Sequence, residues 1–289
     1  MDTMPGIILA MLLVLLISGC TSASPGGGLA IKYFAPDLPQ ALPGERIRLQ
    51  AEIENTGSSE ATAATARILG LESWLGQSLT PDCEAGFSLL PARLGISGST
   101  NVCSWEFTAP DVPDRINVNF KPALRVEYVY SSDLVKAVTI LPREQLVLLR
   151  DQPLPSETTS VSSSPVAFSA EVQTPVRLAG SEVSFPLKIT VNNVGGGAVC
   201  IDDCSEANNI DSIYLAIDAK GMSTDCPNPI RLTLYRGSTN TIQCNMMASG
   251  LNPNAITQKA IKIRSDRESG TAYRYFTDAE TQVTVTGRP

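Results

Sequence analysis

The sequence predicts an all-β protein: two tandem immunoglobulin-like antiparallel β-sandwiches that follow an N-terminal signal or anchor segment. Three observations predict it. Many short segments alternate apolar and polar residues, as strands with one buried face do; the pattern recurs in the two halves of the chain; and no convincing amphipathic helix follows residue 20. A chain of 289 residues is long enough for two such domains, each with its own core.

Composition narrows the function classes. Apolar residues make up 43% and charged residues 18%, which is typical of a globular protein. The net charge of −7 and the pI near 4.8 disfavour nucleic acid as a partner, because phosphate binding needs concentrated Lys and Arg. Histidine is absent, which removes Ser/His/Asp and Cys/His catalytic pairs. We therefore expect no enzymatic activity and no cofactor.

Residues 1–20 read as a signal peptide. Eleven apolar residues run without interruption from Ile7 to Ile17, which is about half the length that a membrane-spanning helix requires. Ile17-Ser18-Gly19-Cys20 then resembles the lipobox of bacterial and archaeal lipoproteins, which implies lipidation of Cys20. The segment before the apolar run departs from the pattern, because it carries an Asp and no Lys or Arg.

The alternative for these residues is an uncleaved, short N-terminal anchor. Either interpretation places the remainder of the chain at the extracytoplasmic face of the cell membrane or at the cell surface. Residues 21–29 contain Ser, Pro and Gly and are expected to form a flexible tether.

An internal repeat supports two similar domains. Gly44 to Gly57 and Gly180 to Gly195 both begin with Gly, alternate apolar residues and end in Asn-x-Gly. The segments Glu127–Ile140 and Ala272–Val285 also align, 145 residues apart, with two tyrosines, an Asp and a Val at equivalent positions. We expect β-sandwiches over 30–148 and 166–289, joined by a Pro/Ser/Thr-rich linker over 149–165. Pro186 interrupts one predicted strand, which argues for an edge or a bulge.

The chain has seven cysteines, so at least one of them has no disulfide partner within the chain. If Cys20 is lipidated, six cysteines remain for disulfides. Fifteen pairings of six cysteines are possible, but the repeat aligns Cys83 with Cys226 and Cys103 with Cys244. It thus predicts equivalent bridges Cys83–Cys103 and Cys226–Cys244, with Cys200 and Cys204 left to each other. Trp105 and Phe107 flank Cys103 and are expected to pack against its bridge, the alternative being an aromatic ligand platform.

Metal binding is the alternative interpretation for some of these cysteines and for the acidic residues near them. Cys200, Cys204, Cys226 and Cys244 could form a four-thiolate zinc site, but the chain lacks paired Cys-x-x-Cys knuckles and an exported protein favours disulfides. The acidic residues Asp202, Asp203, Glu206 and Asp211 could bind calcium, but they lack EF-hand spacing. A solvated acidic loop and no metal are the expected result.

The segment from Pro43 to Ala61, PGERIRLQAEIENTGSSEA, resembles the start of a CARDB-type domain. This cell-adhesion-related, immunoglobulin-like module occurs in bacterial and archaeal surface proteins. The resemblance implies surface display and a role in binding or spacing, and it offers no catalytic residues.

We therefore expect a membrane-anchored, non-enzymatic interaction or spacer module, acting in adhesion or envelope assembly with an envelope or surface protein as its partner. Its exposed sheet edges would be the natural contact surface. One alternative is a solute- or carbohydrate-binding lipoprotein serving a transporter or hydrolase, which would need an aromatic-lined pocket. A carboxylate-pair hydrolase is the other, although none of the 29 acidic residues is singled out by its context.

Overall fold

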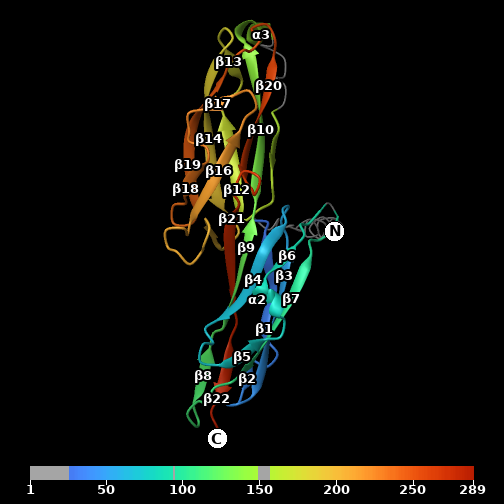
Figure 1. The fold of residues 1–289 in the computed structure, drawn as a ribbon, viewed down its shortest axis with the longest axis vertical. Helices are drawn as coiled ribbons and strands as arrows, with labels where there is room; N and C mark the ends of the chain where they lie inside the picture. The colour runs from blue at the N-terminus through green and yellow to red at the C-terminus, as the bar shows by residue number, and fades with distance from the viewer. Residues whose placement is uncertain (1–25, 94, 149–156) are drawn as a thin grey trace, which may run out of the picture.

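The computed structural model describes residues 26–93, 95–148 and 157–289. These residues form an elongated all-β molecule with two lobes end to end (Figure 1). Two short helices, α2 (Pro81–Ala85) and α3 (Arg143–Leu148), complete the described secondary structure. Within the described residues, no helix has both the length and the apolar character needed to cross a membrane.

Lobe 1, drawn at the bottom of Figure 1, contains strands from both ends of the chain. Its two sheets have the orders β1-β3-β7-β5 and β21-β9-β4-β6, and β22 lies between β2 and β8. The short strand β15 (Ala198–Cys200) extends the second of these sheets by pairing with β21. The strands are β1 (Leu29–Pro36), β2 (Gln40–Ala41), β3 (Arg46–Asn55), β4 (Ala61–Leu69), β5 (Leu75–Ser78), β6 (Phe87–Leu89), β7 (Thr100–Thr108), β8 (Asn117–Phe120), β9 (Ala123–Tyr130), β21 (Tyr273–Glu280) and β22 (Val283–Thr286).

Lobe 2 repeats this arrangement with the orders β12-β14-β19-β17 and β11-β10-β20-β16-β18, and β13 also pairs with β10. Two mainly antiparallel sheets packed face to face are typical of immunoglobulin-like sandwiches. The strands are β10 (Ser132–Pro142), β11 (Thr159–Val161), β12 (Val166–Val172), β13 (Val176–Leu178), β14 (Val183–Asn193), β16 (Ser212–Asp218), β17 (Ser223–Thr224), β18 (Ile230–Thr233), β19 (Thr239–Ala248) and β20 (Thr257–Ser265).

Alternation of apolar residues builds both cores. In β3, Ile47, Leu49, Ala51 and Ile53 are buried, while Arg48, Gln50 and Glu52 between them are exposed. β14 repeats the pattern from Val183 to Val191. The sequence predicted both strands, because a strand places successive side chains on opposite faces of its sheet.

The two lobes exchange strands, and the predicted domain boundaries at 148 and 166 do not account for this exchange. β10 belongs to the first half of the chain but pairs with β20 in lobe 2, from Ser132↔Ser265 to Ile140↔Thr257. In return, β21 pairs with β9 and β22 pairs with β8 in lobe 1. The sheets therefore divide the chain differently from the predicted domains 30–148 and 166–289.

The exchange is reciprocal. In lobe 1, β22 also pairs in parallel with β2, and in lobe 2, β10 pairs in parallel with β13. Each lobe thus receives its last strand from the other copy of the repeat. The local cause is visible between β9 and β10, where Ser131 alone separates the two strands. Because a hairpin loop needs at least two residues, the chain continues straight into the other lobe.

The predicted tether and linker are partly folded. Gly26, Gly27 and Gly28 of the expected tether 21–29 contact Val194, Ser163 and Pro165, respectively. The expected linker 149–165 contributes β11, which pairs with β10, and Glu157, which forms an ion pair with Lys136 at 3.6 Å. Residues 149–156 lie outside the described part.

Pro186 does not lie on an edge strand, because β14 runs between β12 and β19. Its partner on β19 is Asn245, whereas the last residue paired with β12 is Leu187. Pro186 thus lies just beyond the end of β12, where the ladder on that side no longer requires an N–H donor.

Candidate functional site

Four tyrosines mark the junction of the lobes, which we call the waist: Tyr128 and Tyr130 on β9, and Tyr273 and Tyr275 on β21. All four are buried, and the register pairs Tyr130 with Tyr273 and Tyr128 with Tyr275. The rings of Tyr128 and Tyr130 meet edge to face, with centroids 5.8 Å apart. The repeat predicted that these residues are equivalent, but not that they meet.

Each tyrosine hydroxyl is hydrogen-bonded, as buried phenols require. The Tyr128 hydroxyl accepts the Leu29 N–H at 3.1 Å, where β1 begins. The Tyr130 hydroxyl accepts the Ser59 N–H at 3.2 Å. The Tyr273 hydroxyl lies 2.7 Å from Ser132 Oγ. The waist therefore links the crossing strands to the loops of both lobes.

Two Asn-x-Gly turns receive these contacts. Asn193 Oδ1 accepts the Tyr275 hydroxyl at 2.7 Å, and the same hydroxyl accepts the Gly197 N–H at 2.8 Å. Asn193 Nδ2 donates to the carbonyls of Gly197 and Gly237. Asn55 Nδ2 donates in the same way to the carbonyls of Ser59 and Leu89. The recurring Asn-x-Gly is therefore explained by a side chain that satisfies buried loop carbonyls.

Burial raises the pKa of these phenols. It raises the pKa of Tyr130 and of Tyr275 to about 12, and it raises the pKa of Tyr128 and of Tyr273 above the ordinary value as well. The cause is the cost of placing a phenolate among apolar groups. At neutral pH the four hydroxyls therefore remain protonated and act as structural hydrogen-bonding groups.

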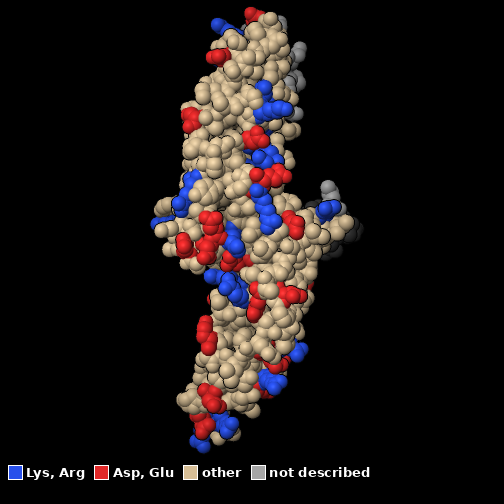
Figure 2. Space-filling model, in the orientation of Figure 1, with Lys and Arg blue, Asp and Glu red and all other residues tan. Residues whose placement is uncertain are grey.

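The other face of this sheet carries what we call the charged ladder: Arg67 on β4, Arg125 and Glu127 on β9, and Arg274 and Asp278 on β21. Arg125 binds Asp278 through two hydrogen bonds, at 2.9 and 2.7 Å, and this contact raises the pKa of Arg125. Glu127 accepts Arg274 at 3.0 Å and lies 3.7 Å from Arg67. Acidic and basic side chains gather over the middle of the face shown in Figure 2.

Each of the three predicted cysteine pairs is a disulfide in the structure. Cys83–Cys103 and Cys226–Cys244 occupy equivalent places: Cys83 in α2 is bonded to β7, and Cys226 in the loop after β17 is bonded to β19, with Cα atoms 6.0 and 5.5 Å apart. Cys200–Cys204 closes a short loop, with Cα atoms 5.3 Å apart. Disulfides indicate an oxidising, extracytoplasmic environment. Cys20 lies outside the described residues.

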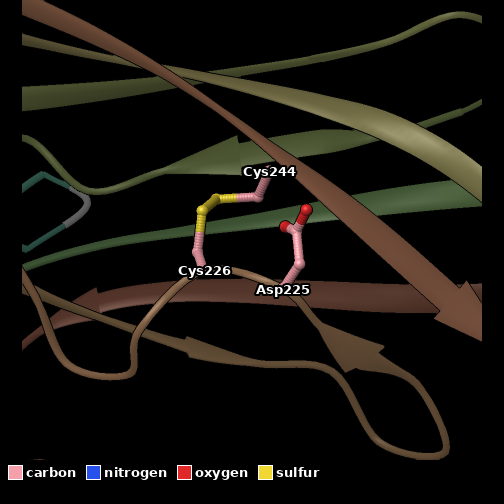
Figure 3. A group of neighbouring side chains, drawn as sticks. All are labelled: Asp225, Cys226 and Cys244. Carbon is pink, nitrogen blue, oxygen red and sulfur yellow. A yellow bond between two sulfur atoms is a disulfide. The ribbon is translucent and has the colours of Figure 1, made fainter.

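The zinc alternative does not fit these contacts, because its four thiols are consumed in two separate disulfides. In the described part of the chain, one group of three possible metal-ligating residues has its ligand atoms within 4.8 Å: Asp225, Cys226 and Cys244 (Figure 3). The Asp225 carboxylate accepts the Asn245 N–H at 2.7 Å and Asn245 Nδ2 at 2.8 Å. The disulfide and these hydrogen bonds thus hold the loop that contains Asp225 and Cys226 against β19.

The acidic loop supports its own conformation. Asp203 accepts the Ser205 N–H at 2.9 Å, and this bond lowers the pKa of Asp203. Glu206 accepts Asn209 Nδ2 at 3.3 Å, and burial raises the pKa of Asp211. Asp202 has a left-handed backbone, with φ of 56°. Two of the four carboxylates, those of Asp203 and Glu206, thus accept hydrogen bonds from neighbouring loop groups.

Removing the Cys83–Cys103 bridge should destabilise the protein more than removing Cys200–Cys204. The cysteines are 20 residues apart in the first pair and 4 in the second. Loop-closure entropy then predicts losses of about 3 and about 2 kcal/mol, respectively. Urea unfolding of the two double Cys→Ala variants measures both losses. Equal losses, or a larger one for Cys200–Cys204, would contradict loop closure as the source of stabilisation.

Trp105 belongs to the core of lobe 1. It is 1% exposed, and its indole Nε1 donates to Glu84 in α2 at 3.0 Å. Phe107 is partly buried against the same core. Both side chains thus pack into the core of lobe 1 and do not form an exposed aromatic platform.

A surface hollow of about 370 Å³ lies at the end of β19. It is lined by small polar and aliphatic residues, among them Glu182, Ser184, Ser223 and Met247. None of its lining residues is aromatic, so this hollow lacks the stacking surface that a carbohydrate site would use.

The first strands of the two lobes, β1 and β12, are equivalent edge strands. They differ in the features that prevent a further strand from pairing with them. In β1 the register shifts at Lys32, and Pro36 ends the strand. The Asp37 N–H donates to Arg48 O, so by alternation the backbone nitrogen of Pro36 faces away from β3. Bulges, lysines and edge prolines all discourage the addition of a further strand.

β12 has none of these devices. It keeps a regular register with β14 over seven residues, from Val166↔Asn193 to Val172↔Leu187. Within the described residues it pairs with no other strand. Because Val194 N–H donates to Pro165 O, the N–H groups of Phe168 and Ala170 point away from β14. At Val166 the outward carbonyl accepts Ser164 Oγ at 2.8 Å, so β12 offers an open edge from Phe168 onward.

Comparisons with known proteins do not assign a family. No protein-family model matches the chain, and no curated protein matches it. The CARDB resemblance therefore stays a prediction.

Among solved structures, the Yersinia pseudotuberculosis adhesin InvE aligns over 91% of this chain and 61% of its own, with 11% identity and a TM-score of 0.19. Red sea bream transglutaminase aligns over 90% and 32%, with 10% identity and a TM-score of 0.21. The chain thus spans less than two thirds of either protein, and superposition at this level is too poor to carry an argument about function.

Proposed function

We propose that the chain is a membrane-anchored, extracytoplasmic and non-enzymatic interaction module, which binds an extended segment of another envelope or surface protein. Its contribution to adhesion or envelope assembly would be non-covalent recognition. The lipobox-like Ile17–Cys20 supports anchoring, and the three disulfides support an oxidising compartment. The absence of histidine supports a role without acid–base catalysis near neutral pH.

The observation that carries this proposal is the open edge of β12. An extended peptide that pairs with an edge strand gains main-chain hydrogen bonds, and its alternate side chains supply specificity. The equivalent strand β1 has a shifted register and a terminal proline, whereas β12 has neither. We therefore assign partner binding to lobe 2.

Photocrosslinking in the organism that encodes the chain would test this assignment. A benzophenone side chain at Ser169, an exposed residue of β12, should capture a partner of defined mass. The Ala170→Pro variant should abolish that adduct, because proline removes an outward N–H while leaving the ladder to β14 intact. Far-UV circular dichroism of this variant should match the wild type.

Two controls accompany this experiment. The same probe at Tyr33, a half-exposed residue of β1, should give no adduct of that mass. Equal capture from both strands, or a Ser169 adduct that survives Ala170→Pro in a folded protein, would overturn strand addition at β12.

A further inference from the structure

We infer that the protein is held to the membrane by its waist and lies along the bilayer, with the uncharged side of the waist toward the lipid. The inference rests on the membrane anchoring in the proposed function and specifies its geometry. Three observations carry it: where the described chain begins, how many residues separate that point from the expected anchor, and how charge is distributed around the waist.

The described chain begins at the waist and not at the tip of a lobe. A Cβ on Gly26 would lie 2.5 Å from Val194 O, and one on Gly28 would lie 2.7 Å from the Tyr128 hydroxyl. A Cβ on Gly27 would collide with Ser163. The carbonyl of Gly28 accepts the Thr56 N–H at 2.8 Å. These close contacts hold residues 26–28 between turns of both lobes.

The preceding residues are too few for the molecule to stand on either end. Five residues, 21–25, separate Cys20 from Gly26, so the Cα atoms of Cys20 and Gly26 are at most about 20 Å apart. From the waist, β10 runs 11 residues into lobe 2, which is about 36 Å. In the other direction, residues 273–286 of β21 and β22 run into lobe 1, which is about 45 Å.

The same conclusion holds for the alternative anchor. If the apolar run ending at Ile17 stayed uncleaved in the membrane, its end could lie at most about 30 Å from Gly26. This distance is also shorter than either lobe. An upright orientation would require the waist to be about 36 Å or more above the bilayer, and neither anchor reaches that far.

The two sides of the waist differ in charge. Tyr128 and Tyr130 point toward the loops that surround Gly26–Gly28, because their hydroxyls bind Leu29 and Ser59. Arg125 and Glu127 alternate with these tyrosines and so lie on the opposite face of β9. The charged ladder is therefore on the side of the waist away from the N-terminal segment.

Three segments that lie next to the N-terminal segment contain no charged residue. Residues 56–59, 162–165 and 192–197 are Ser, Thr, Asn, Gly, Pro and Val. A chain with a net charge of −7 would be repelled from anionic lipid through most of its surface. Because residues 56–59, 162–165 and 192–197 are uncharged, this side of the waist can approach the lipid headgroups closely.

Neutron reflectometry on a supported bilayer would test the orientation. The membrane-extracted, full-length protein would be reconstituted into phosphatidylethanolamine with one quarter phosphatidylglycerol. Lying along the bilayer, two packed sheets with their side chains should form a layer about 30 Å thick. Standing upright, the two lobes should form a layer about 80 Å thick. We expect the thin layer.

A longer tether is the matched control. Thirty Gly/Ser residues inserted between Ser24 and Pro25 would release the waist without altering the described fold, so the layer should become thicker and less sharply bounded. A thick layer for the wild-type protein, or an identical thin layer with the long tether, would overturn the inference that the short tether sets the orientation.

Membrane fractionation separates this inference from the anchoring on which it rests. The wild-type protein should remain with membranes after a carbonate wash, and Cys20→Ser should lose this retention if the anchor is a lipid. A wild-type protein that washes off would overturn the anchoring itself. A retained protein that forms a thick layer would overturn only the waist geometry.

Discussion

Each half of the chain, produced alone as residues 21–148 or 157–289, should fail to form its lobe, and the two halves mixed together should restore the native fold. The first half lacks β21 and β22, and the second lacks β10. Four fully buried aliphatic residues of β10, Leu134, Val138, Ile140 and Leu141, would leave lobe 2. Each contributes about 1.5–3 kcal/mol, so their loss is comparable to the whole stability of a domain, about 5–15 kcal/mol.

Circular dichroism and urea unfolding of each half, and of the mixture, measure this effect. A matched control keeps every strand: a protease site placed within residues 149–156 and then cleaved. Because each disulfide lies within one half, the cleaved protein should elute as one particle in native buffer and as two chains in denaturant. Two halves that unfold cooperatively on their own and do not associate would refute the exchange of strands.

Stability should fall steeply between pH 10 and pH 12 because of the waist tyrosines. An unfolded tyrosine titrates near pH 10, whereas burial raises the pKa of Tyr130 and Tyr275 in the folded protein to about 12. Above pH 10 the unfolded chain therefore binds fewer protons than the folded one. Each such tyrosine should remove about 1.4 kcal/mol per pH unit, and this contribution is fully present below pH 10.

Urea midpoints measured from pH 8 to pH 11.5, with tyrosinate absorbance recorded in parallel, would check this slope. Tyr130→Phe should reduce the slope by about 1.4 kcal/mol per pH unit, even though it lowers stability at pH 8 by removing the bond to Ser59. Tyr33→Phe, at a half-exposed residue of β1, should leave the slope unchanged. Tyrosinate absorbance that rises fully before unfolding would contradict burial of these hydroxyls.

Local patterns in the sequence sufficed for the strands and the disulfides. Alternation in β3 and β14 identified the buried faces, because side-chain direction in a strand depends only on the parity of the position. Alignment of Cys83 with Cys226 and of Cys103 with Cys244 identified equivalent bridges, because copies of one fold place equivalent residues at equivalent points. Both inferences needed no knowledge of which lobe each strand joins.

The open edge of β12 could be recognised only in part. Its sequence shows that Lys32 and Pro36 of β1 have no counterpart in β12, which contains neither lysine nor proline. Whether an edge is open depends on which strands lie beside it, and those strands are distant in the chain. Pro186 illustrates the same limit, because its tolerance follows from where β12 ends.

By itself, the sequence determined an all-β fold, an internal repeat and the cysteine pairs, and it predicts an N-terminal segment of the exported type. Only the tertiary structure decided that the repeats exchange their last strands, that four tyrosines meet at the waist, and that the chain begins there. The physical reason is that hydrophobic alternation specifies which face of a strand is buried, but not against which sheet. That choice follows from the straight passage through Ser131 and from the contacts that glycines at 26–28 allow.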